Sequence, residues 1–184
     1  MKMKNSCFIL LLLVLCVGCI DNPAIHKEAI VNNYIDSISN VSIVGVRERI
    51  VGIHVDEFPY GVATNIRYRV WIYADSVNKY ISNEKLSQLT SSHKSVAVRY
   101  VTFKLLLNRD SHKAIDYLMH DINNTDSIYA LRFDQGQMES LTSLRVELAT
   151  KRKLYNISLK DSLALKKVIM KYKINYFPYT VKKY

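Results

Sequence analysis

The segment “HKAIDYLMH” at 112–120 holds the most reactive cluster of side chains in the sequence. His112, Asp116 and His120 are spaced four residues apart, and this spacing places them along one flank of a helix. Two imidazoles and a carboxylate are ligands that a zinc ion accepts. However, the two histidines are separated by two helical turns, about 12 Å, which is too far for both to bind one ion. The pattern therefore favours a solvated helix face, and we predict no metal site and no cofactor.

A second cluster lies in “NIRYRVWIYA” at 65–74, where apolar and polar residues alternate with a period of two. Such alternation predicts a half-buried antiparallel strand. Arg67, Arg69, Trp71 and Tyr73 would share one face of this strand, and arginines beside aromatic rings can bind sugars, bases or proteins. Alternatively, Trp71 belongs to the core and the arginines extend past it to solvent. We keep these four residues as a candidate binding face.

All three cysteines lie in the opening stretch “MKMKNSCFILLLLVLCVGCID”. Lys2 and Lys4 precede an apolar run of about ten residues, which is too short to span a bilayer as a helix and is typical of a secretory signal. Its end, “LCVGC”, resembles the lipobox of bacterial lipoproteins, in which a small residue precedes a cysteine. The resemblance implies cleavage after Gly18 and attachment of lipid to Cys19. It covers only about the first twenty residues.

The lipobox resemblance has one departure, because Cys16 stands where the family usually has leucine. The alternative is an ordinary cleaved signal peptide with a chance cysteine. If the resemblance holds, cleavage removes Cys7 and Cys16, and lipid occupies the thiol of Cys19. Ile20 follows this cysteine in place of the aspartate that favours inner-membrane retention in some bacteria. We therefore expect a lipid-anchored protein of the cell envelope, with the outer membrane favoured over the inner membrane.

The chain is basic, with 26 lysines and arginines against 16 acidic residues and a formal net charge of +10. Basic residues are densest toward the C-terminus, and no acidic residue follows Asp161. A basic cytosolic domain would suggest nucleic acid, but an exported one meets lipid headgroups and anionic wall polymers. The alternative is a solvated basic surface with no specific partner. We predict a membrane partner through the lipid anchor, with a protein or an anionic envelope polymer as a further candidate, and no nucleic acid.

The tripeptide Asp-Ser followed by Ile, Val or Leu occurs four times, more often than its composition suggests. It resembles the acceptor of a periplasmic O-glycosylation system in one large group of Gram-negative bacteria, which implies sugars on exposed serines. The alternative is that Asp and Ser are common at caps and turns. The candidate serines are Ser76 and Ser127, expected near strand ends and therefore preferred, and Ser37 and Ser162, expected within helices.

The elements that must position these residues follow from hydrophobic periodicity. We expect helices at 24–38, 82–89, 111–122 and 159–173, and strands at 41–55, 65–74, 94–107 and 127–133. The segment 41–55 is one long strand or two strands broken near Arg47–Glu48, and the ending “INYFPYTVKKY” is a strand or extended tail. Residues 137–152 fit a helix and a strand equally. “SLKD” at 158–161 resembles a capping box, with Ser158 as the N-cap.

Together these patterns predict an α+β fold in which an N-terminal helix packs on a mainly antiparallel sheet, with further helices interspersed. We expect a cleaved signal peptide at 1–18, a short tether at 19–23 and a single globular domain at 24–184. Motifs of serine hydrolases, P-loop proteins and zinc proteases are missing from the sequence. We therefore expect a non-catalytic binding or protein-interaction module, not an enzyme. The alternative is a small periplasmic metal-dependent hydrolase using the 109–120 segment.

Overall fold

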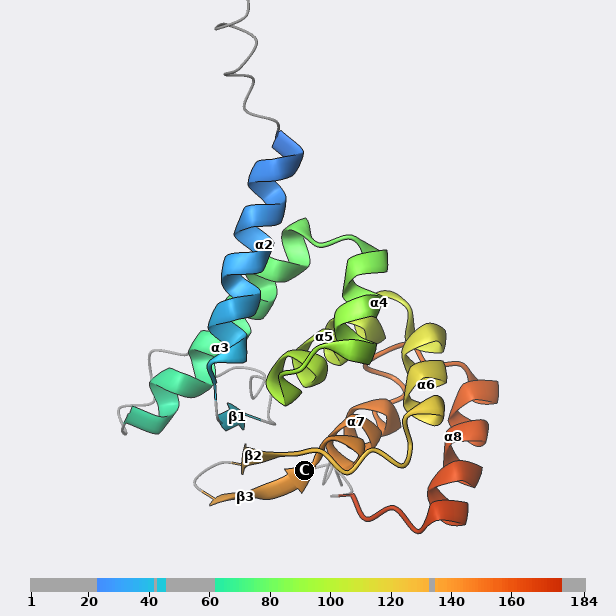
Figure 1. Cartoon of the computed structure of the whole chain (residues 1–184). Helices are drawn as coiled ribbons and strands as arrows, with labels where there is room; N and C mark the ends of the chain where they lie inside the picture. The colour runs from blue at the N-terminus through green and yellow to red at the C-terminus, as the bar shows by residue number, and fades with distance from the viewer. Residues whose placement is uncertain (1–22, 42, 46–61, 133–134, 177–184) are drawn as a thin grey trace, which may run out of the picture.

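The computed structural model describes residues 23–41, 43–45, 62–132 and 135–176. Figure 1 shows them as a group of helices above and beside a small sheet. The signal peptide, the tether up to Asn22 and the candidate lipid-bearing Cys19 lie outside the described residues, as does most of the strand expected at 41–55. The helices are α2 (Pro23–Ser39), α3 (Val62–Tyr80), α4 (Asn83–Ser92), α5 (Val96–Arg109), α6 (Ser111–His120), α7 (Leu141–Thr150) and α8 (Leu159–Tyr172).

The sheet has three short strands in the order β1 (Ile43–Gly45), β2 (Ser127–Arg132) and β3 (Gln135–Ser140). β1 runs parallel to β2, and β3 runs antiparallel to it. The α+β class is thus confirmed in general, but helices dominate the described residues and the sheet is small and mixed. The strand expected at 127–133 is confirmed, and the ambiguous stretch after residue 137 divides into the end of β3 and the whole of α7.

The segment 65–74 is part of helix α3, so the strand predicted there is wrong. Its apolar positions continue past the end of the predicted strand, with Val70, Ala74 and Val77 all buried and spaced four and three residues apart. This is the spacing of one helix face. Ile72, which the strand would have buried together with Val70, is exposed. The segment 65–74 alone is too short to distinguish the two-residue period of a strand from the 3.6-residue period of a helix.

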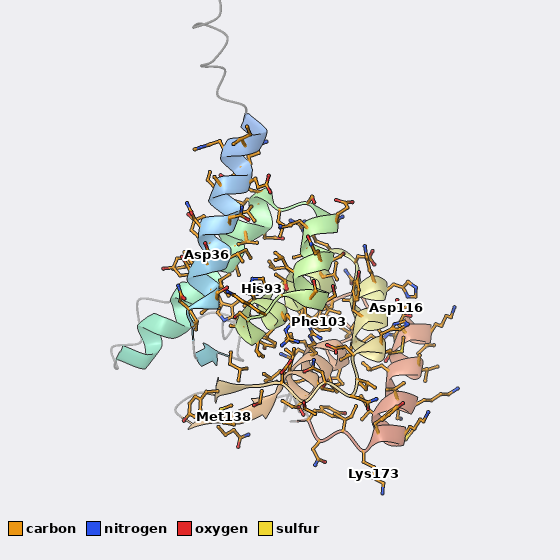
Figure 2. The ribbon with its side chains drawn as sticks, in the orientation of Figure 1. Asp36, His93, Phe103, Asp116, Met138 and Lys173 are labelled. Carbon is orange, nitrogen blue, oxygen red and sulfur yellow. The ribbon has the colours of Figure 1, made fainter. Side chains whose placement is uncertain are left out.

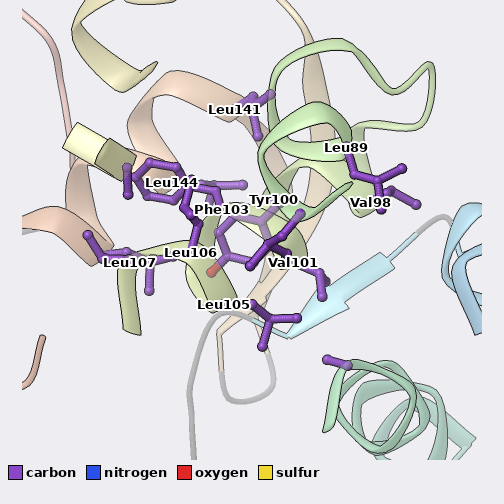
Figure 3. Close-up of a cluster of buried hydrophobic side chains, with 14 of the residues drawn as sticks. Leu89, Val98, Tyr100, Val101, Phe103, Leu105, Leu106, Leu107, Leu141 and Leu144 are labelled. Atoms are coloured by element: carbon purple, nitrogen blue, oxygen red, sulfur yellow. The ribbon is translucent and has the colours of Figure 1, made fainter. Parts of the chain in front are cut away.

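The segment 94–107 is also helical, as α5, and the strand predicted there is wrong. Every residue from Ala97 to Leu107 except Lys104 is buried. A helix that is buried on nearly all sides needs no polar face, so its sequence is mostly apolar without a helical period, as in a buried strand. Its ends have ordinary caps, because the Ser95 hydroxyl accepts a hydrogen bond from the Val98 N–H. Figure 3 shows α5 side chains packed together with residues of α4 and α7.

The N-terminal helix predicted at 24–38 is present as α2, but it does not pack on the sheet as predicted. Instead, α2 packs mainly against α3 and also against α5, and Figure 1 shows α2 and α3 side by side. The rings of Tyr34 and Tyr73 meet between the two helices with their centroids 5.8 Å apart. The reason is that residues 62–80 form a helix, which offers α2 a helical partner where a strand was expected.

Two arginines join the helices at the centre of the fold. The Arg145 side chain on α7 is buried and donates to Asp121 Oδ2 at 2.7 Å and to the Thr90 carbonyl oxygen at 2.7 Å. Arg99 on α5 donates to Asp126 Oδ2 at 2.5 Å. Burial lowers the pKa of Arg145 to about 10, and the nearby carboxylate of Asp121 opposes this lowering. These contacts tie α4, α5 and α7 to the loop that leads into β2.

Among the described helices, none combines the length and the apolar character that crossing a bilayer requires.

Candidate functional site

The row His112, Asp116 and His120 lies on α6 as predicted, but its members have separate partners. The Nδ1 atom of His112 lies 2.9 Å from Asp161 Oδ1 on the neighbouring helix α8. The Nδ1 atom of His120 lies 2.8 Å from the Asp116 carbonyl oxygen and 3.5 Å from its carboxylate. Ile115 and Leu118 on the inner side of α6 are buried, whereas His112 is exposed. The two ends of the row therefore point to different neighbours.

Asp161 is the buried centre of a small polar cluster at the start of α8. Its backbone N–H donates to the Ser158 hydroxyl at 3.0 Å, as the predicted N-cap requires. The same hydroxyl donates to Asp161 Oδ2 at 2.7 Å. The hydrogen bond from Ser158 lowers the pKa of Asp161 below its usual range, and the hydrogen bond to His112 adds to this effect. The cluster therefore joins the cap of α8 to the surface of α6.

This cluster resembles a catalytic arrangement only in its composition. A carboxylate that holds Nδ1 of an exposed imidazole leaves Nε2 open, as a general base would need. The Ser158 hydroxyl, however, is bound to the carboxylate and not to His112, so no base activates it as a nucleophile. Within the described ranges, no three His, Cys, Asp or Glu side chains lie close enough to hold a metal ion. The hydrolase alternative therefore stays a hypothesis.

The four residues of the binding face predicted at 67–73 lie on helix α3 and not on a strand. On a helix, positions 67 and 69 are about 200° apart, so the four positions divide into two pairs. The side chains of both arginines lie outside the described residues. The Trp71 ring packs edge-on against Tyr100, with centroids 6.3 Å apart, and Lys104 Nζ lies 3.8 Å from its centroid. Because Tyr73 packs against α2, both aromatic rings contact other helices of the fold.

The four Asp-Ser serines have different surroundings. Ser127 is exposed at the first position of β2, as predicted, and Asp126 before it is held by Arg99. Ser76 lies within α3 and not near a strand end, so the reason for preferring it was wrong. Ser37 and Ser76 are partly buried, and each hydroxyl donates to the carbonyl four residues earlier. Ser162 is also partly buried, within α8. Ser127 is thus the most accessible of the four acceptors.

The outer face of the β2–β3 hairpin exposes two apolar side chains directly opposite each other. Tyr129 on β2 pairs with Met138 on β3, and Met138 is 61% exposed. Their neighbours Ile128 and Ala130 are buried on the inner face, as the alternation of strands requires. Figure 2 shows the labelled Met138 on the hairpin, away from the helices. We refer to Tyr129 and Met138 as the hairpin surface; the exposed Gln137, which pairs with Ala130, belongs to the other face of the strand.

A shallow hollow of about 340 Å³ adjoins the hairpin surface. Its lining comes from β3, the first turn of α7 and the segment after α8: Gln137, Met138, Glu139, Ser140, Ser143, Asn175 and Tyr176. Ser143 joins two of these parts, because its hydroxyl donates to the Asn175 carbonyl oxygen at 2.5 Å. The lining has one carboxylate and no basic side chain, in contrast to the basic chain as a whole. The hollow suits a largely neutral ligand segment.

The hairpin surface was missed by sequence reasoning. Tyr129 lies in a predicted strand, but Met138 lies in the stretch that fits a helix and a strand equally. Its partner could therefore not be assigned. Periodicity alone offers no signal for the break between β3 and α7. The local signal is Ser140, whose hydroxyl accepts a hydrogen bond from the Ser143 N–H as an N-cap.

Comparison with protein-family models, with curated proteins and with solved structures gives no match for this chain. The assignment of a candidate site therefore depends on the geometry of this structure alone.

Proposed function

We propose that the chain is a lipid-anchored lipoprotein of the bacterial cell envelope that acts as a non-catalytic protein-interaction module. The anchoring part of the proposal is supported by the lipobox-like “LCVGC” ending at Cys19. Ile20 in place of aspartate favours the outer membrane over the inner one. The observation that carries the interaction role is the exposed Tyr129–Met138 pair beside the hollow at β3.

The hairpin surface suits an extended segment of a partner protein. Among the described strands, none pairs with β3 on the side away from β2. A strand edge offers backbone donors and acceptors to an added strand, and adjoining pockets take its side chains. The exposed apolar pair Tyr129–Met138 and the hollow next to it would supply these contacts. By contrast, Arg99, Arg145 and His112, whose chemistry could serve catalysis, make contacts that hold the fold together.

Lipid attachment is tested by incorporation of radiolabelled palmitate in a bacterial host that processes lipoproteins. The wild-type chain is expected to take up label and Cys19→Ala to lose it. Cys16→Ala is the matched control and should keep the label, because Cys16 lies in the part removed by cleavage. Label that survives Cys19→Ala would refute the assigned site.

The partner surface is tested by placing a photo-crosslinking amino acid at Gln137, and separately at the exposed Gln88 on α4 as a control. We expect the full chain in its envelope to crosslink to one protein from position 137 and not from position 88. Met138→Asp should abolish that crosslink, whereas Ile72→Asp, at a similarly exposed apolar residue, should preserve it. Identical crosslinking patterns from both positions would exclude a partner at the hairpin.

The hydrolase alternative is favoured by one observation, the pairing of His112 with the buried Asp161. It predicts a divalent ion at the exposed Nε2 atom of His112. Zinc titration of the wild type and of His112→Ala by calorimetry distinguishes the two functions. A binding heat that disappears in His112→Ala and persists in His26→Ala would favour the hydrolase.

The O-glycosylation proposal now centres on Ser127. In a host with the corresponding glycosylation system, the mature protein should carry added mass that Ser127→Ala lowers. Ser37→Ala and Ser162→Ala should leave the mass unchanged, because both serines are partly buried in helices. Loss of added mass from these two variants alone would contradict the assignment.

A further inference from the structure

Helix α8 carries apolar side chains on two opposite sides. Leu165 is buried on its inner side, where α8 packs against α6. Leu159, Leu163 and Met170 are instead 57%, 51% and 62% exposed. At 100° per residue these three lie within about 40° of one another, on the side opposite Leu165. We refer to them as the outer stripe of α8.

Lysines border the outer stripe on both sides. Lys166 lies on one side of it, and Lys160, Lys167 and Lys171 lie on the other, all of them exposed. The acidic residue of this helix, Asp161, is buried on the inner side and is held by Ser158 and His112. The outer face of α8 therefore presents apolar and cationic side chains, with no carboxylate of its own.

This face lies at the edge of the molecule. Figure 1 shows α8 beyond α6, with no described element on its far side. Figure 2 shows its side chains extending outward, with Lys173 labelled just after the last turn. The C-terminal end of α8 is well defined, because Lys173 adopts a left-handed conformation with φ 51° and its N–H donates to the carbonyl oxygens of the last turn. The outer stripe is thus presented on a complete, capped helix.

We propose that the outer face of α8 lies against an anionic lipid bilayer, with the outer stripe in the boundary between headgroups and acyl chains. An apolar stripe bordered by lysines is the pattern of helices that lie in a membrane interface. Lysine stems extend along the apolar region while their ammonium groups reach the headgroups. A protein partner fits this face less well, because lysine is depleted in protein–protein interfaces. The contact does not depend on lipid at Cys19.

The consequence for the molecule is orientation. A lipid at the N-terminus would hold the chain near a membrane but would leave it free to rotate. A second contact at α8 fixes which side faces the bilayer and so which side is open to other proteins.

The electrostatic part is tested with the full chain carrying Cys19→Ala, so that no lipid is attached. Its partition is measured by co-sedimentation with vesicles of phosphatidylcholine, with and without about 30 mole per cent of the anionic lipid phosphatidylglycerol. Lys166→Glu/Lys167→Glu is compared with Lys79→Glu/Lys94→Glu, which reverses two exposed lysines on other elements and changes net charge equally. The N-terminal apolar run is present in all variants and cancels in the comparison.

We expect the α8 variant to lose at least about 25-fold in partition to anionic vesicles, since one lysine near such a surface contributes about fivefold. The control variant should lose much less, and added salt should remove the difference. Equal losses in the two variants would overturn the proposal. So would unchanged vesicle binding combined with loss of a crosslink to an acidic protein, which would assign this face to a protein.

Depth of insertion is tested independently of charge. The tryptophan introduced by Leu163→Trp should be quenched by lipids brominated on their acyl chains. The one introduced by Met138→Trp, at a comparably exposed residue of the hairpin, should not be quenched. Trp71 is present in both variants and serves as the common background. Equal quenching would overturn the proposal, while palmitate labelling at Cys19 would still report separately on the anchor.

Discussion

Arg145 offers the sharpest test of how the helices are held together. Arg145 is 1% exposed, yet its guanidinium stays charged at neutral pH because its pKa falls only to about 10. A fall from 12.5 to about 10 means that the folded state holds this proton about 3 kcal/mol less tightly than the unfolded chain does. The charge is therefore a net cost that the contacts of Arg145 only partly offset.

The structure then predicts an unequal effect of removing either partner of the pair. Asp121→Asn keeps the shape of the side chain but takes away the counter-charge of a buried cation. Breaking a buried pair costs about 3–5 kcal/mol, and because the Asp121 side chain is one-third exposed we expect about 2–3 kcal/mol of unfolding free energy. Arg145→Met removes the buried charge itself but leaves the Thr90 carbonyl oxygen without this donor, at about 1–3 kcal/mol. The two effects nearly cancel, so this variant should lose about 1 kcal/mol or less.

The assay is urea unfolding at pH 7, followed by far-ultraviolet circular dichroism and by Trp71 fluorescence. The double variant Arg145→Met/Asp121→Asn should be about as stable as Arg145→Met alone, which gives a coupling energy of about 2–3 kcal/mol. Thr102→Val, a buried change on α5 outside this pair, controls for general sensitivity of the core. If Arg145→Met loses more than Asp121→Asn, the guanidinium is a net stabiliser and the reasoning from its lowered pKa is wrong.

Three further outcomes are expected. Val70→Ser should lower the free energy of unfolding by about 2–4 kcal/mol and Ile72→Ser by less than about 0.5 kcal/mol, since Val70 is buried and Ile72 is exposed. Equal urea midpoints for the two variants would favour the strand predicted at 65–74 over the helix. The hydrogen bonds from Ser158 and then His112 lower the pKa of Asp161 in the folded state. The stabilisation that Asp161 contributes is therefore complete above pH 3.8, the pKa of the unfolded chain, and is lost as the pH falls through the folded-state pKa. Asp161→Asn should therefore flatten the acid side of a plot of Tm against pH, and an unchanged slope would refute that origin. Arg109→Lys should lower the free energy of unfolding in urea by about 1 kcal/mol, because a single ammonium cannot reproduce the contacts of Arg109 with Asn78, Ile81 and Asn83. A lysine variant as stable as the wild type would show that these contacts are dispensable.

The helices α6 and α8 were predicted correctly because the sequence of each contains both a helical period and a cap. The helix of α8 was correct because Ser158 caps it and Leu165 lies on its inner side. α6 was correct for the same reasons, with Asp110 as its N-cap. In these segments the local signal and the tertiary environment agree, so the sequence alone was sufficient.

The two wrong strands share a physical cause. Aromatic and β-branched residues favour strands on average, but packing overrides this preference when a segment is buried against other helices. Val98, Val101 and Thr102 lie in α5 and are surrounded by other helices. The length of the segment at 94–107, and the lack of glycine and proline within it, was the available evidence for a helix.

The candidate site was less predictable than the fold. Both surfaces proposed for binding depend on which residues remain exposed after packing, and this is a tertiary property. The outer stripe of α8 was assigned to a helix correctly, but no pattern in Leu159 and Leu163 indicates which of two apolar sides turns outward. The spacing of His112 with Asp116 and His120 is visible in the sequence, whereas its partner Asp161 lies 49 residues later in the chain, on another helix.

The burial of α5 on all sides has a consequence for how this protein can change over evolutionary time. A substitution between Ala97 and Leu107 must preserve volume against several neighbours at once, whereas the hairpin and α8 meet solvent and can drift toward new partners. The slowest-changing stretch among its descendants should therefore be α5, which touches no ligand in either proposal. In a comparison of such sequences, invariance would identify the scaffold, and the functional surfaces would be found where the residues vary.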